Sequence, residues 1–347
     1  MNPSPHRQQH KITYHNGFDQ HNLLNMSSLT SHLSSKDTHA TAAAECLSVI
    51  LTKELTTYSC KGYLDPSDPT MITDADRKIL VDWCYGVVDN CDFSRETVAV
   101  AMEMVDRFLS VTAGPAALWE TNSDVARIGN EVLSSKDKFQ LLTIAALYSS
   151  IKIGEKFVLS SEQFAEMCCG IYKKEEIEDT ERTLLRGLSW RSIAPTAYEV
   201  VHYLASLIAH YVTMPEATWA FLLDVTKYQI EHAVRDYFFS TQRTSTIALA
   251  AIFNAIKGIS SHEKRHEVIG AFRLQVVECF DFDKSTLVNM ARKRLQSSLS
   301  LPFIHSGDSA KTCSSRKRAR DNDFCYEGDA SYHKSSRNSP GLISPSL

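Results

Sequence analysis

A glutamate on an apolar helical row is the first residue whose chemistry needs an explanation. In "IEDTERTLLRGLSW" (177–190), helical spacing puts Glu181 in one row with Ile177, Leu184 and Leu188. A carboxylate on a buried stripe is costly unless a cation or a hydrogen-bond donor pairs with it. We therefore expect Glu181 either to pair inside the fold or to face a partner molecule.

Lys152 is a second charge at the end of an apolar row, after Leu141, Ala145 and Tyr148. A lysine at a helix end often lays its aliphatic stem on the protein and keeps its ammonium in water. The alternative is a charge presented at the edge of an interface, beside Glu181. Spacing alone leaves both interpretations open.

Arg77 and Asp106 form a third set of charges in apolar surroundings. Arg77 is the first residue on the apolar side of one predicted helix. Asp106 lies between Met102 and Leu109 on the next predicted helix. Buried charges of opposite sign usually pair, because an unpaired buried charge strongly destabilises the fold. We predict an Arg77–Asp106 salt bridge with a structural role.

Signatures of catalysis are absent from the sequence. It contains no Gly-rich phosphate loop, no G-x-S-x-G and no H-E-x-x-H. His6 and His10 have the spacing of a helical metal pair, but they lie in a polar segment with no second pair of ligands. No catalytic residue, metal or cofactor is therefore expected, and a binding function is favoured over an enzymatic one.

Composition narrows the class of protein. The chain has 347 residues, 43% of them hydrophobic, and nine cysteines without a C-x-x-C pair, which indicates reduced thiols. Residues 73–300 carry 25 Lys and Arg against 30 Asp and Glu, a net charge of −5, which argues against nucleic acid as the main ligand. No signal peptide and no apolar run of membrane-spanning length is present, so no membrane partner is expected.

Helical patterns dominate the chain, and no convincing strand pattern interrupts them. Start signals include Thr73, Ser94 and the capping box of Ser160 and Gln163. The segment 112–135 contains Gly-Pro and predicts a long loop. Helices are predicted at 40–59, 73–89, 95–110, 136–153, from Ser160, at 177–190, and at 196–211, 216–233, 241–257, 262–280 and 283–299.

Two runs of about five helices, each with an Ala-rich third helix, predict an internal duplication. The expected fold is all-α: two tandem five-helix bundles, an N-terminal helix and disordered tails. The predicted units are a polar tail at 1–39, the N-terminal helix with a first bundle at 40–196, a more divergent second bundle at 197–300, and a basic Ser-Pro tail at 301–347.

Four segments resemble the cyclin box. They are "RKILVDWCYGVV" (77–88), "ETVAVAMEMVDRFLS" (96–110), "KFQLLTIAALYSSIK" (138–152) and "ERTLLRGLSWRSIAPT" (181–196). The resemblance covers about 73–196 well and is weaker over 197–299. It implies a cell-cycle regulator that binds and activates a cyclin-dependent Ser/Thr kinase.

The resemblance also implies which residues meet the kinase. Cyclins use a Lys at the end of the third helix and a Glu in the fifth, which match Lys152 and Glu181. Such a charged clamp would hold the kinase's regulatory αC helix, with additional contact from the N-terminal helix. The neighbouring kinase-binding positions correspond to Ile153, Glu155, Leu185 and Trp190.

Relatives also carry a patch on the first helix that docks protein substrates. It corresponds here to Ile79, Leu80, Trp83 and, from the third helix, Gln140. The sequence departs from the family pattern at Asp76, where an apolar Met is common, and at Gly86, where an acid is common. An Asp in an apolar groove would weaken docking of Leu-containing motifs.

The C-terminal segment carries candidate regulatory signals. "SRKRAR" (315–320) is a compact basic cluster typical of a nuclear-import signal, with Arg316, Lys317, Arg318 and Arg320, and the expected localisation is nucleus and cytoplasm. Ser339 and Ser344 each precede a proline and are minimal phosphorylation sites. The first 72 residues contain no R-x-x-L degradation box.

Two rival functions stay open at this stage. One is a cyclin-like adaptor that binds a kinase without activating it. Asp76 favours it, and so does "KIGEK" (152–156) at the end of the third helix, where only Glu155 remains of two acids common in relatives. The other is a cyclin-fold transcription factor. The acidic helical body and the lack of a zinc ribbon weigh against the second.

Overall fold

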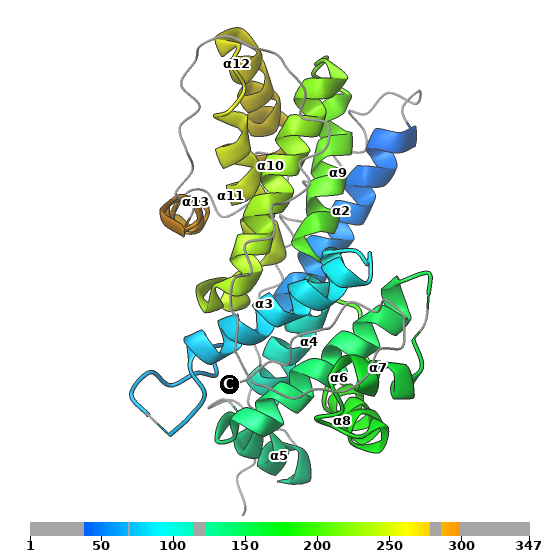
Figure 1. Ribbon diagram of the computed structural model, residues 1–347. Coiled ribbons are helices and arrows are strands. Elements are labelled where there is room, and N and C mark those ends of the chain that lie inside the picture. Colours follow the sequence, from blue (N-terminus) through cyan, green and yellow to red (C-terminus); the bar gives the residue numbers. More distant parts are fainter. Residues whose placement is uncertain (1–37, 69, 114–122, 158, 278–285, 299–347) are drawn as a thin grey trace, which may run out of the picture.

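The computed structural model describes residues 38–68, 70–113, 123–157, 159–277 and 286–298, and within these ranges the chain is helical with no strand. Figure 1 shows two groups of helices, one above the other. The lower group contains α3 (Asp74–Asn90), α4 (Glu96–Thr112), α5 (Ser123–Leu133), α6 (Lys136–Gly154), α7 (Ser161–Met167) and α8 (Lys174–Gly187). The upper group contains α9 (Ala197–Ala209), α10 (Glu216–Arg235), α11 (Thr244–Ile256), α12 (His262–Ala271) and α13 (Thr286–Ser298), with short helical turns at Tyr237–Thr241 and Phe272–Val277. The predicted all-α fold is confirmed.

Each group of helices encloses its own apolar core. In the first bundle, α4 and α6 are the most extensively buried helices and contribute side chains such as Phe108, Phe139 and Leu147. In the second bundle, the Ala-rich α11 holds the corresponding place. Small residues on these helices let their neighbours approach closely, so each one serves as the centre of its bundle.

The N-terminal helix α2 (Thr38–Thr56) belongs to the second core and not to the first. Ala40, Ala44, Leu47 and Ile50 are buried there, and α2 lies alongside α9 (Figure 1). The predicted unit 40–196 grouped this helix with the first bundle. Its apolar row instead matches the exposed apolar side that α9 would otherwise present to water.

Helix starts follow the capping signals in the sequence. Ser160 forms the predicted capping box with Gln163, and Thr73, predicted as a helix start, forms a second capping box with Asp76. The start of α4 differs from the prediction: Arg95 is the cap residue, although the Ser94 hydroxyl still accepts a hydrogen bond from the Glu96 amide at 3.3 Å.

The predicted loop at 112–135 is wrong in its second half, where α5 forms. This short amphipathic helix packs on α4 and α6, and the burial of its apolar side stabilises it. Gly129, which argues against a helix by propensity, has a packing role. A Cβ at this position would lie 2.6 Å from Thr112 Cβ and 2.9 Å from the Thr112 carbonyl carbon. Only glycine allows α5 to approach the end of α4 this closely.

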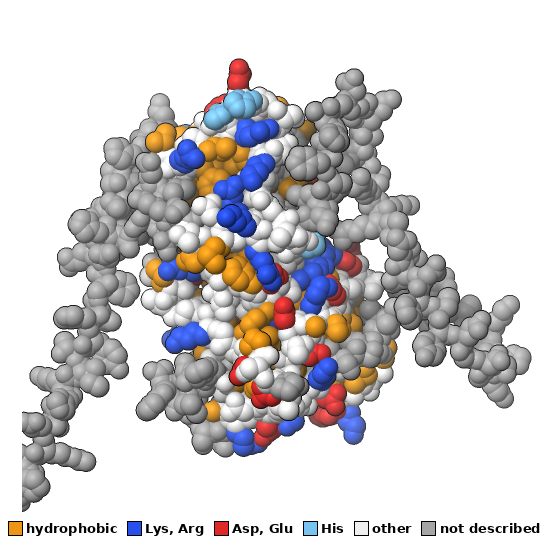
Figure 2. Space-filling view, turned by 90° about the vertical axis from the view of Figure 1, so that its left-hand side faces the viewer, with side chains coloured by type: hydrophobic (Ala, Val, Ile, Leu, Met, Phe, Trp, Pro, Cys, Tyr) orange, Lys and Arg blue, Asp and Glu red, His pale blue; other side chains and the backbone are white. Residues whose placement is uncertain are grey.

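Charged side chains are unevenly spread over the surface. On the face in Figure 2, Lys and Arg gather over the upper, second bundle, whereas acidic side chains accompany them lower down. Arg292, Lys293 and Arg294 of α13 and Lys264 and Arg265 of α12 belong to the second bundle. The net negative charge of the helical body is therefore not uniform.

We predict that Gly129→Ala destabilises the fold by about 1–3 kcal/mol, because the added methyl group overlaps the backbone of Thr112. Gly86→Ala is the matched control: Gly86 lies in α3 with nothing within 4 Å of an added Cβ, so this change is expected to stabilise by up to about 1 kcal/mol. Urea unfolding of both variants measures the difference, and equal effects would contradict the close-approach role.

Candidate functional site

Lys152 and Glu181 form an ion pair between α6 and α8. Lys152 Nζ lies 2.7 Å from Glu181 Oε2 and also 4.5 Å from the centre of the Tyr148 ring. Lys152 stands in the last turn of α6, where the helix dipole favours a cation. The side chain of Lys152 is 34% exposed and that of Glu181 is 10% exposed. The pair therefore lies at the edge of the bundle, with the carboxylate inside and the ammonium outside.

Glu181 keeps one unmet acceptor. Its Oε1 atom is buried and has no hydrogen-bond partner among the described residues. A buried acceptor without a donor costs roughly 1–3 kcal/mol. The sequence raised the alternatives of an internal pair and a partner-facing charge. The geometry shows the internal pair: one oxygen binds Lys152, and the other is buried without a donor among the described residues.

Exposed apolar side chains occur at and after the ends of the two helices that carry this pair. Ile153 is 43% exposed, Trp190 is 66% exposed, and Leu185 is half-buried between them in sequence. Two further side chains escaped the sequence-based prediction, Phe157 at 77% and Ile193 at 62% exposure. They follow α6 and α8 outside any helical row, so periodicity gave no signal for them. We call the set Lys152, Ile153, Phe157, Glu181, Leu185, Trp190 and Ile193 the α6–α8 face.

The turn after α8 has an unusual backbone. Ser189 and Trp190 are consecutive non-glycine residues with positive φ, 52° and 62°. The Trp190 amide donates to the Leu185 carbonyl at 2.8 Å, which closes the helix end in this conformation. Left-handed backbone is costly for an aromatic residue and often occurs at functional sites. Here it coincides with the outward display of Trp190.

The segment that follows lies along α4. Arg107 Nη2 donates to the Arg191 carbonyl at 2.5 Å, and the Thr196 hydroxyl donates to Glu96. The end of α6 reaches the same first turn of α4, because Glu155 Oε1 accepts from the Ser94 amide at 2.9 Å and from the Thr97 hydroxyl. The ends of α6 and α8 are thus held on one common support.

A buried arginine ties this support to the second bundle. Arg77 makes two hydrogen bonds to Asp106, Nε–Oδ1 at 2.9 Å and Nη2–Oδ2 at 2.6 Å, and its Nη1 donates to the Val234 carbonyl at 2.8 Å. Tyr63 Oη donates to Asp106 Oδ1 at 2.6 Å. Burial alone would lower the pKa of Arg77, but the Asp106 carboxylate outweighs it and raises that pKa. The predicted structural salt bridge is present.

Comparison with known proteins assigns this architecture to a family. The family model described as "Cyclin, N-terminal domain" matches residues 45–192. That range contains α3 to α8, with the Lys152–Glu181 pair and the Arg77–Asp106 pair. Residues 45–192 therefore form a cyclin N-terminal domain, and this part of the chain belongs to the cyclin family.

Several curated relatives of this cyclin carry the words "G2/mitotic-specific" in their names. It is 26% identical over 180 residues to the G2/mitotic-specific cyclin-B3 of Gallus gallus, which covers 52% of this chain and 38% of the chicken protein. It is 28% identical over 181 residues to the G2/mitotic-specific cyclin-B3 of Drosophila melanogaster, covering 52% of this chain and 27% of that protein. The chain thus spans less than two-fifths of the length of these two relatives.

A solved structure shares the fold. The viral cyclin from herpesvirus saimiri superposes with a TM-score of 0.50 at 14% sequence identity, covering 73% of this chain and 97% of the viral protein. This coverage extends beyond residues 45–192 that the family model matches. The second bundle of this cyclin therefore belongs to the shared fold, although its sequence pattern is the more divergent.

The substrate-docking patch expected from the cyclin resemblance is only partly at the surface. Ile79 is 44% exposed and Trp83 is half-buried, but Leu80 is fully buried. Gln140 is also buried, and Tyr172 Oη donates to its Oε1 at 3.0 Å. Neighbouring helix positions point about 100° apart, so Leu80 faces the core while Ile79 and Trp83 share the outer side. Leu80 and Gln140 are core residues.

Asp76 has a structural role that the sequence did not reveal. Its carboxylate accepts from the Thr73 amide at 2.9 Å and lies 2.8 Å from Lys136 Nζ. Burial pushes the pKa of Asp76 upward, but the hydrogen bonds from Lys136 and Thr73 outweigh burial and hold it below its usual value. Asp76 therefore caps α3 and does not place a bare charge in an apolar groove.

Several expectations fall outside the described residues. The basic cluster Arg316, Lys317, Arg318 and Arg320 and the candidate phosphorylation sites Ser339 and Ser344 lie in 299–347, and His6 and His10 lie in 1–37. Within the described part of the chain, no helix is long and apolar enough to cross a membrane, and no three metal-ligating side chains cluster.

We predict that Arg77→Met destabilises the chain by about 3–5 kcal/mol, because it leaves the Asp106 carboxylate buried without its cation. The double variant Arg77→Met with Asp106→Leu removes both charges and is expected to lose less stability than the single variant, despite the unmet hydrogen bonds of Tyr63 and Val234. Chemical denaturation of both proteins tests this order, and a double variant less stable than the single one would contradict it.

Proposed function

We propose that this cyclin binds a cyclin-dependent Ser/Thr kinase through the α6–α8 face and activates it, thereby regulating the cell cycle. The observation that carries the proposal is the Lys152–Glu181 pair. It combines a partly exposed ammonium, a carboxylate oxygen without a partner among the described residues, and a border of exposed apolar side chains. A central desolvated polar group framed by apolar and aromatic side chains is typical of protein interfaces.

The proposed mechanism is positioning and involves no chemistry by the cyclin itself. An active kinase needs the glutamate of its αC helix paired with the lysine that binds the nucleotide phosphates, so the position of αC controls activity. A rigid face that binds only the inward position of αC shifts the kinase population by its differential affinity for the two states. The double anchoring of α6 and α8 on α4 supplies the rigidity.

We propose that the polar and the apolar residues of the α6–α8 face contact different parts of the kinase. The Lys152–Glu181 pair would bind polar groups at the end of αC and its neighbouring backbone, mainly through the partly exposed Lys152 ammonium. Ile153, Leu185 and Trp190 would cover the apolar side of that helix, with Phe157 and Ile193 widening the contact. Glu155 already caps α4 with one oxygen, so its proposed contact with the kinase depends on the other. The exposed residues Val49 and Leu55 of α2 would extend the interface.

Two relatives carry the words "G2/mitotic-specific" in their names, which supports a role in cell division for this chain as well. The adaptor alternative, binding without activation, is favoured by the internal engagement of Glu155. A histone-kinase assay on the purified complex separates the two: phosphate transfer above that of the kinase alone supports activation, and none supports the adaptor. Docking of protein substrates would use the exposed Ile79 and the half-buried Trp83.

We predict that Lys152→Ala combined with Glu181→Ala weakens kinase binding by roughly 30-fold or more, because truncating a desolvated charge pair at an interface typically costs 2–5 kcal/mol. Co-purification of the kinase with the tagged full chain, followed by titration, measures the loss. Circular dichroism at 222 nm, a signal of α-helix, is expected to remain unchanged because the pair lies at the edge of the bundle.

The matched control is Lys138→Ala with Glu131→Ala. These residues form an ion pair of similar chemistry in which the side chains are 51% and 37% exposed, away from the α6–α8 face. It is expected to retain full kinase binding. Equal binding by the wild-type chain and the Lys152/Glu181 variant would overturn the proposal.

Nuclear import through the basic cluster is a separate proposal. Four cations within 316–320 match the chemistry that import receptors recognise. Replacing Arg316, Lys317, Arg318 and Arg320 by Ala in a fluorescent fusion is expected to reduce the nuclear fraction in cells. An unchanged nuclear fraction would argue against this role, and the kinase-binding proposal would be unaffected.

A further inference from the structure

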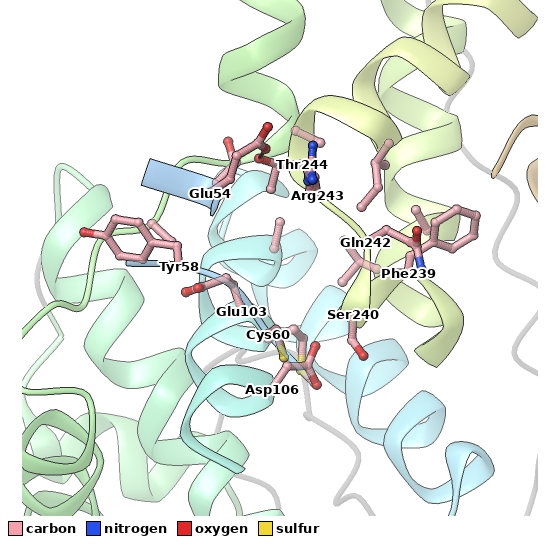
Figure 3. Close-up of a pocket in the computed structure, with 18 of the residues that line it drawn as sticks. Glu54, Tyr58, Cys60, Glu103, Asp106, Phe239, Ser240, Gln242, Arg243 and Thr244 are labelled. Carbon is pink, nitrogen blue, oxygen red and sulfur yellow. Dashed lines mark hydrogen bonds between the residues drawn. The ribbon is translucent and has the colours of Figure 1, made fainter. Parts of the chain in front are cut away.

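A pocket of ≈ 320 Å³ lies where α2, α4 and the second bundle meet (Figure 3). Its walls come from the end of α2 and the residues that follow, from α4, from the 194–197 linker, and from the segment leading into α11. Most of its lining is apolar, including Leu55, Met102, Pro195, Ile230, Phe239 and Ile247. It is separate from the Lys152–Glu181 pair, neither member of which lines it.

Glu103 brings an unsatisfied carboxyl group into this pocket. Its Oε1 lies 3.0 Å from Arg107 Nε without the alignment of a hydrogen bond, and its Oε2 is buried with no partner among the described residues. Arg107 also donates through Nη2 to the Arg191 carbonyl and lies 4.8 Å from the Tyr58 ring centre, while its Nε has no hydrogen-bond partner among the described residues. Burial raises the pKa of Glu103 to about 8, although Arg107 lowers it in part.

The other acidic groups around the pocket have their partners. Asp106 binds Arg77 and Tyr63. Glu54 caps α11, where it accepts from the Thr244 hydroxyl at 2.8 Å and the Ser245 amide at 3.0 Å. Burial raises the pKa of the Cys60 thiol, so it stays neutral.

Arg243 and Tyr58 are two further titratable residues that line the pocket (Figure 3). Among the described carboxyl groups that line the pocket, Glu103 alone has an unmet acceptor.

We infer that this pocket binds an organic cation, an amidinium, guanidinium or ammonium group on a compact apolar body. The apolar walls match the body of such a ligand, and the free oxygen of Glu103 matches its N–H donors. The pocket volume lies at the lower end of the range for small-molecule sites, which limits the ligand to one ring or a short alkyl chain. The site goes beyond kinase binding and does not depend on it.

Proton linkage gives this site a specific signature. A bound cation favours the carboxylate over the neutral acid, so it lowers the pKa of Glu103 and releases a proton below about pH 8. Affinity for the cation therefore rises with pH until the carboxyl group of the empty pocket is already ionised. Between about pH 6.5 and pH 8.5 the ionised fraction grows roughly 20-fold, which is the largest gain expected.

The test uses benzamidine as the cation and benzamide as its neutral counterpart of the same shape. Titration calorimetry and thermal shift of the full chain are expected to give a benzamidine Kd on the order of 1 mM near pH 8.5, and weaker binding near pH 6.5. Benzamide is expected to bind at least about tenfold more weakly, because it lacks the charge that pairs with Glu103. The observed enthalpy is expected to depend on the buffer, which reports the released proton.

Three variants distinguish binding at this pocket from non-specific binding elsewhere on the protein. Glu103→Gln keeps the shape and is expected to lose both the preference for benzamidine and the pH dependence. Thr241→Trp keeps Glu103 but fills the exposed rim, and is expected to abolish binding. Glu131→Gln changes an exposed carboxylate of α5 and is the control with unchanged binding. Equal affinity for the two probes, or unchanged benzamidine binding by Glu103→Gln, would overturn the inference.

Two natural sources share this chemistry, a free small cation and an Arg side chain of a protein. A capped Gly-Gly-Arg-Gly-Gly peptide distinguishes them. Tighter binding of the peptide than of benzamidine points to a protein side chain, and tighter binding of benzamidine points to a free molecule. Absence of binding by both probes at about 10 mM, well above the Kd expected for ligands of this size, would overturn the proposed site. Kinase co-purification is a separate measurement, so the two proposals fail independently.

Discussion

The two bundles are joined by the buried guanidinium of Arg77. Its three donors reach Asp106 on α4 and the Val234 carbonyl near the end of α10, so one side chain connects α3, α4 and the second bundle. Tyr63, from the segment between α2 and α3, completes the shell around Asp106. A buried charge is stable only when its partners remain in place, which makes this junction intolerant of sliding between bundles.

The α6–α8 face depends on that junction through α4. The first turn of α4 holds the end of α6 through Glu155, and its later turns hold the segment after α8 through Arg107. Asp106, which pairs with Arg77, lies on the same helix. The helix that anchors the bundles to each other also fixes the distance between Lys152 and Trp190. A binding face built on rigid helices can discriminate between two positions of a partner helix.

The pocket at Glu103 follows from the same arrangement. The 194–197 linker crosses between the bundles and leaves space between α4 and the segment leading into α11. The other acidic side chains there stabilise the junction. Asp106 forms a salt bridge with Arg77, and Glu54 accepts a hydrogen bond at the start of α11. Glu103 keeps one oxygen without a hydrogen-bond partner among the described residues. It is therefore the carboxyl group of the pocket that has an acceptor to offer a ligand.

The sequence by itself determined the helices and their class. Thr73, and Ser160 with Gln163, marked helix starts, because capping is a local interaction over three residues. Helical rows also singled out Lys152, Glu181, Arg77 and Asp106, since a charge on an apolar row needs a partner wherever the row packs. Helix α5 was decided by tertiary contact instead, because Gly129 is favourable only where Thr112 approaches it.

Placement between distant segments was decided only by the tertiary structure. The apolar row of α2 specified that it must be buried but not against which helix, and α9 of the second bundle covers it. Leu80 and Ile79 are neighbours of the same type, yet the rotation of α3 against its core buries one and exposes the other. The free oxygens of Glu181 and Glu103 are likewise invisible in sequence, because whether an acceptor is satisfied depends on donors from elements far away along the chain.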